Sequence, residues 1–62
     1  MYESIKTIIE YTHYDITESV NQHLKEGWEL ISTHIIEDRN EIGNIEFIYF
    51  YVMGLPKDNN KQ

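Results

Sequence analysis

The most strongly patterned stretch of the chain is residues 45–53, where every side chain except Glu46 is apolar or aromatic. Successive side chains of a β-strand point to opposite faces of a sheet. The stretch therefore presents two sets of three residues: Phe47, Tyr49 and Tyr51 on one face, and Ile48, Phe50 and Val52 on the other. A strand that is apolar on both faces is expected at the centre of a sheet with something packed on each side.

Two further segments have strand character. Residues 2–11 are rich in β-branched side chains, and alternation predicts that Ile5 and Ile9 share one face while Ile8 lies on the other. Residues 28–36 predict a second strand in which Leu30 and Ile36 share a face, with Trp28 and Leu30 expected in the core.

A helix is predicted between these two strands, over residues 16–26. Asp15 is the expected N-cap, with Glu18 at the capping-box position three residues later. Gly27 is expected to end the helix in a left-handed conformation. The apolar stripe has a spacing of four residues and consists of Ile16, Val20 and Leu24.

The predicted order is therefore strand, helix, strand, strand, with a polar hairpin loop at residues 38–44. A right-handed crossover makes the first two strands parallel, and the apolar third strand fits best between them. The predicted fold class is α+β: a three-stranded antiparallel sheet of the split βαβ type, with one helix on one face. We expect one small domain over residues 1–55, and a flexible polar tail over residues 56–62 that begins where Gly54 and Pro56 stop the last strand.

One helix can cover only one face of this sheet. The uncovered face would form an apolar patch larger than monomeric proteins usually expose. Three outcomes remain open. The tyrosines stay at the surface while loops fold over the rest of the patch, a second copy of the chain covers the patch, or a different protein covers it. Self-association is favoured, and the predicted interface is residues 47–52. Alternation alone does not tell which of their two faces packs against the helix.

Length and composition point in the same direction. A chain of 62 residues without cysteine has no disulfide or thiolate metal site to reinforce a small core. Oligomerisation is then the remaining route to stability. No secretory signal is recognisable at the N-terminus, and the apolar run at residues 45–53 is too short to span a membrane as a helix. A cytoplasmic protein without membrane contact is expected.

The formal charge of −6 opposes direct binding to nucleic acid, whose phosphates attract Lys and Arg. Solubility is the simpler explanation of this acidity. The alternative is a surface that competes for a basic groove on another protein.

No pattern of residues indicates catalysis or a cofactor. The chain has no glycine-rich phosphate loop and no nucleophile elbow, and His13, His23 and His34 match no metal-binding spacing. The acidic residues near the hairpin lack the alternating oxygens of a calcium loop. We therefore expect no catalytic residues, no cofactor-binding residues and no metal ligands.

Residues 25–32 read Lys-Glu-Gly-Trp-Glu-Leu-Ile-Ser. This run resembles the signature of small uncharacterised bacterial and phage domains, in which a short helix ends in Glu-Gly-Trp-Glu-Leu and leads straight into a strand. The order and length of the flanking elements are also similar over residues 2–53. The resemblance implies the fold described above and very little about function.

The sequence thus predicts a non-catalytic protein-interaction module that forms a homodimer and binds another protein. A phage or mobile-element inhibitor of a host defence factor or other host protein, acting by occlusion and using its acidic surface, is the more specific hypothesis. The alternative is a small-molecule-binding module with tyrosines and histidines around a ligand at a dimer interface.

Overall fold

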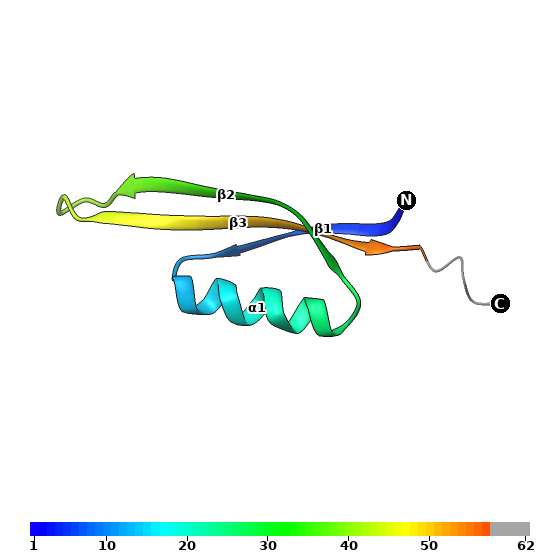
Figure 1. Ribbon diagram of the computed structural model, residues 1–62. Helices are drawn as coiled ribbons and strands as arrows, with labels where there is room; N and C mark the ends of the chain where they lie inside the picture. The colour runs from blue at the N-terminus through cyan, green and yellow to red at the C-terminus, as the bar shows by residue number, and fades with distance from the viewer. Residues whose placement is uncertain (58–62) are drawn as a thin grey trace.

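The computed structural model describes residues 1–57 as a three-stranded antiparallel sheet with one helix against one face (Figure 1). The elements, in chain order, are β1 (Tyr2–Glu10), α1 (His13–Lys25), β2 (Glu29–Arg39) and β3 (Ile45–Pro56). The strand order is β1-β3-β2, so the apolar third strand is central. The predicted α+β class and strand arrangement are confirmed.

The helix begins one turn earlier than the sequence indicated. The predicted cap, Asp15, lies inside the first turn, and its backbone N–H donates to the Thr12 hydroxyl at 3.0 Å. Thr12 is in an extended conformation and is the actual N-cap. Asp15 still places a carboxylate in the first turn, where the helix dipole favours it. The helix ends as predicted before Gly27, which has a φ of 96°.

The strands are offset along the sheet. β1 pairs with β3 as far as Glu10 opposite Tyr49, whereas β2 continues to Arg39 opposite Ile45. The β2–β3 hairpin therefore extends beyond the end of β1 and beyond α1, at the left of Figure 1. We call residues 36–48, the part of the hairpin beyond β1, the arm.

A register shift in β2 corrects one prediction. The shift lies between Leu30, opposite Met53, and Ser32, opposite Val52. A bulge adds one residue to its strand and so reverses the alternation beyond it. Leu30 and Ile36 consequently lie on opposite faces, not on one face as simple alternation predicted. Leu30 also remains 44% exposed, so its expected place in the core is wrong.

The C-terminal end of the sheet also differs from expectation. β3 continues through Gly54 and includes Pro56, whereas the sequence predicted that these two residues would end the strand earlier. Ser4 pairs with Leu55, and the N–H of Lys57 donates to the carbonyl of Met1. Pro56 is tolerated because it lies at the strand end. The hairpin connection is shorter than predicted and comprises residues 40–44. Residues 58–62 of the predicted tail lie outside the described residues.

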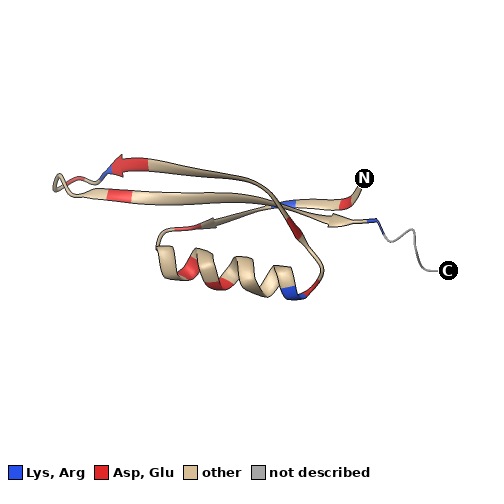
Figure 2. Ribbon diagram, viewed as in Figure 1, with Lys and Arg blue, Asp and Glu red and all other residues tan. Residues whose placement is uncertain are grey.

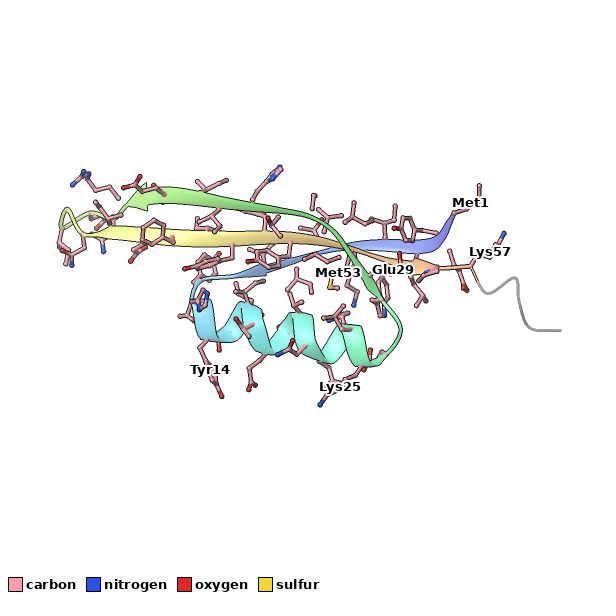
Figure 3. All side chains as sticks on the ribbon, in the orientation of Figure 1. Met1, Tyr14, Lys25, Glu29, Met53 and Lys57 are labelled. Atoms are coloured by element: carbon pink, nitrogen blue, oxygen red, sulfur yellow. The ribbon has the colours of Figure 1, made fainter. Side chains whose placement is uncertain are left out.

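The core between the sheet and α1 is small. Among residues 1–57, the buried apolar side chains are Ile8, Ile16, Val20 and Met53, and of these Ile16 and Met53 are fully buried. Figure 3 shows Met53 between the sheet and the helix, while Tyr14 and Lys25 point away from the sheet. The accessible surface of 4831 Å² exceeds the roughly 4,250 Å² expected for a compact protein of this mass. The domain therefore leaves much of its sheet uncovered.

Candidate protein-interaction surfaces

The sheet face opposite α1 is covered by no other element among residues 1–57 (Figure 1). Pairing across the strands identifies the side chains that share this face. We call them the open face: Ile5, Thr7 and Ile9 from β1, Ser32, His34 and Ile36 from β2, and Ile48, Phe50 and Val52 from β3. None of the nine is Asp, Glu, Lys or Arg, and the acidic residues on the same side of the sheet lie at its two ends, Asp38 and Glu46 in the arm and Glu29 opposite Gly54.

The apolar centre of the open face lies on Phe50, which is opposite Ile9 in β1 and His34 in β2. Ile5, Ile9 and Ile36 expose 62%, 48% and 47% of their surface. The open face takes five residues of β3, 48–52, which at about 3.3 Å each gives a length of about 17 Å. Three strands about 4.8 Å apart are about 14 Å wide, so the footprint is about 240 Å².

The register also settles which half of the predicted interface faces the helix. Tyr49 and Tyr51 pack against the core under α1. Ile48, Phe50 and Val52 lie on the open face. Phe47 shares the helix side with the tyrosines but lies in the arm, beyond the helix, and is 45% exposed. The six residues predicted as one interface therefore belong to three environments.

The sequence-based prediction of an interface included only the third strand and neither of the flanking strands that share the open face. Ile5 and Ile9 could have been found, because alternation placed them on one face of β1. Ile36 could not, because the bulge in β2 leaves no recognisable signal in the sequence.

One end of the open face is closed by Tyr2. Its hydroxyl donates to Glu29 Oε1 at 3.1 Å, so the side chain reaches from β1 across β3 to β2. Gly54 lies directly beneath the Tyr2 ring, since a Cβ added to Gly54 would be 2.6 Å from that ring. The hydrogen bond to Glu29 raises the pKa of Tyr2, with desolvation adding to the shift. This contact ties the two edge strands together.

The helix side of the arm is also exposed. α1 starts at His13, whose ring meets Tyr49 edge-on at a centroid distance of 6.1 Å. Helix cover ends there, and Ile45, in the arm beyond, is 48% exposed. The arm carries four carboxylates, those of Glu37, Asp38, Glu41 and Glu46, against the single arginine Arg39, for a formal charge of −3. Figure 2 shows these charges gathered at the end of the hairpin.

A hollow of about 480 Å³ lies where the arm leaves the domain. Its lining consists of Tyr11, Ile45, Glu46, Phe47 and Tyr49. Glu46 alternates with Ile45 and Phe47 along β3, so both faces of the strand contribute. The hollow therefore lies along the strand edge, in the position that β1 would occupy if it continued past Glu10.

The three histidines have different contacts and lie on different parts of the domain. His23 Nδ1 lies 2.7 Å from the Ser19 carbonyl, so this nitrogen carries the proton, and Nε2 lies 3.1 Å from Lys6 Nζ. The Lys6 ammonium also lies 5.1 Å from the Trp28 ring centroid. This cluster attaches the end of α1 to β1. His34 is on the open face, and His13 contacts Tyr49.

Among residues 1–57, no three His, Asp or Glu side chains come close enough to hold a metal ion. In the same part of the chain, the single helix is neither long nor apolar enough to cross a membrane. Comparisons with protein-family models, curated proteins and solved structures find no match to this chain. The resemblance of residues 25–32 to small bacterial and phage domains stays a prediction.

Proposed function

We propose that this chain is a non-catalytic protein-interaction module of the cytoplasm, and that a second copy covers its open face. The supporting observation is a sheet with α1 on one side and nine uncharged residues, six of them Ile, Val or Phe, on the other. Two such footprints total about 480 Å², which is below the roughly 1,000 Å² of a stable specific interface and fits a weak, concentration-dependent dimer.

The absence of charge on the open face favours a second copy as its partner. In a symmetric dimer each residue meets the same surface of its partner. Like charges at such an interface would repel, and the three on this side of the sheet, Glu29, Asp38 and Glu46, lie at its two ends, outside the nine residues. Packing of two sheets face to face also encloses apolar side chains in a layer about 10 Å thick, as in β-sandwiches.

Light scattering over a wide concentration range tests this proposal. The proposal expects twice the 7.5 kDa chain mass for the native chain and the single-chain mass for Phe50→Glu. A matched control is Ile42→Glu, since Ile42 is 80% exposed in the hairpin turn and outside the open face. A native chain that stays monomeric at millimolar concentration, or a Phe50→Glu variant that is folded and still dimeric, would contradict the proposal.

The small-molecule alternative receives less support. It requires tyrosines and histidines around a ligand at the dimer interface. Tyr49 and Tyr51 lie on the helix side, and His34 is the single histidine of the open face. The proposed interface therefore carries few of the polar groups that would orient a ligand.

The finer proposal is a phage or mobile-element protein that inhibits a host factor by occlusion. It rests on the resemblance of residues 25–32 and on the formal charge of −6. Capture experiments with the native chain in a bacterial lysate test it. A stoichiometric host protein whose activity falls on binding is expected, and recovery of no such protein would count against inhibition.

A further inference from the structure

The free edge of β3 in the arm offers a second surface, distinct from the open face. β1 pairs with β3 only at residues 49–56 and ends at Glu10, opposite Tyr49. Residues 45–48 of β3 pair with β2 on one side and with no described strand on the other. An unpaired strand edge presents backbone N–H and C=O groups that can accept another strand.

The hollow gives this edge room for an occupant. It holds about 480 Å³ and is bounded by Tyr11 at the end of β1 and by residues 45–47 and Tyr49 of β3. A four-residue strand is about 13 Å long. An extended segment placed in line with β1 would complete the sheet beside residues 45–48 and direct alternate side chains toward Phe47.

Charge decides what kind of segment fits. The arm has a formal charge of −3, and Glu46 lines the hollow itself. Glu37 is paired with Phe47 across the arm and shares its face. Two copies of this arm placed edge to edge would bring two charges of −3 together, which disfavours a second copy at this site. A basic segment would instead be attracted to the negative charge of the arm.

We propose that residues 45–48 bind an extended, basic peptide segment of a partner protein by strand addition. An apolar or aromatic side chain of the segment enters the hollow beside Phe47 and Tyr49. Lys or Arg side chains flanking it lie near Glu37 and Glu46, and an Arg or Lys can also stack on the exposed aromatic rings. This inference deepens the proposed function by naming the site and chemistry of the foreign partner.

The test begins with a random-peptide display library selected against the immobilised full chain. Enriched peptides are expected to be net positive, with an apolar residue between basic ones, and their affinity should fall as salt rises because charges are screened. Peptides of net negative or zero charge, or no enrichment at all, would overturn the proposal.

Three variants locate the binding site. Phe47→Ser is expected to weaken the selected peptide at least about tenfold, as loss of a central aromatic contact does. Glu46→Gln should weaken it and reduce its salt dependence. Ile42→Ser, in the turn of the same arm, is the matched control and should bind within about twofold of the native chain. Equal affinity for Phe47→Ser and the native chain would place the peptide elsewhere and refute the site.

Hydrogen exchange tests strand addition itself. The peptide should slow amide exchange within residues 45–48, and unchanged exchange there with peptide bound would contradict the mechanism. Self-association is measured on the same samples. If the chain is a dimer and selects no peptide, the peptide site is refuted and the open-face proposal stands. If the chain is a monomer and binds the peptide, the open-face proposal is refuted and the peptide site stands.

Discussion

Ile9→Thr is the substitution that examines the open face most quantitatively. Ile9 lies opposite Phe50 at the centre of that face and is 48% exposed. Threonine keeps the β-branched shape that suits a strand. It replaces apolar surface with a hydroxyl group, which loses hydrogen bonds to water when a partner covers it.

The expected magnitude follows from the exposed fraction. Complete burial of an isoleucine side chain contributes about 1.5–3 kcal/mol, so covering the exposed half contributes about 0.7–1.5 kcal/mol per chain. A two-fold dimer contains two such residues, which gives about 1.5–3 kcal/mol. Because about 1.4 kcal/mol corresponds to a factor of ten, the dissociation constant should rise about 10- to 100-fold.

Sedimentation equilibrium over a dilution series measures that constant for the native chain and for Ile9→Thr. Ile42→Thr in the hairpin turn is the control and should dimerise like the native chain. Circular dichroism should show the same secondary structure for all three chains. A dissociation constant for Ile9→Thr within about threefold of the native value would refute the assignment of Ile9 to the interface.

Three further predictions concern the fold. Gly54→Ala should lower the free energy of unfolding by about 1–3 kcal/mol in chemical denaturation, because the added Cβ would overlap the Tyr2 ring; a similar loss in a Tyr2→Ala background would contradict that cause. Thr12→Ala should cost about 1 kcal/mol, since the N-cap hydrogen bond to the Asp15 amide disappears, and equal stability of the two chains would show that the cap is not needed. Since the hydrogen bond to Glu29 raises the pKa of Tyr2 above its ordinary value of 10.0, the folded chain keeps the Tyr2 proton to higher pH than the unfolded chain does. The resulting stabilisation is complete below pH 10 and is lost as pH rises through the raised pKa; tyrosinate absorbance should show one late-titrating group that Tyr2→Phe removes, and a late-titrating group that persists in Tyr2→Phe would refute it.

Much of the fold was accessible from the sequence because its signals are local. The stripe of Ile16 and Val20, the glycine that ends the helix and the long apolar third strand each depend on neighbouring residues. The central place of β3 followed from its apolar character on both faces. The N-cap was misplaced by three residues because both Thr12 and Asp15 are good capping residues, and only the backbone conformation distinguishes them.

The candidate surfaces were less accessible because they depend on how the strands are aligned. The bulge in β2 moves Leu30 to the face opposite Ile36, and nothing near it in the sequence marks an inserted residue. The offset between β1 and the hairpin, which creates the arm and exposes Phe47, is a property of strand pairing. Alternation grouped Phe47 with Tyr49 and Tyr51 correctly, but could not tell that α1 begins beside Tyr49 and leaves Phe47 uncovered.

Intermolecular nuclear Overhauser effects in a mixture of isotope-labelled and unlabelled chains test the central claim most directly, because they identify the side chains that touch a second copy. The account predicts contacts between chains that involve Ile9, Ile36 and Phe50 of the open face. Contacts confined to the outer surface of α1, around Tyr14 and Lys25, or no contacts between chains at millimolar concentration, would contradict it.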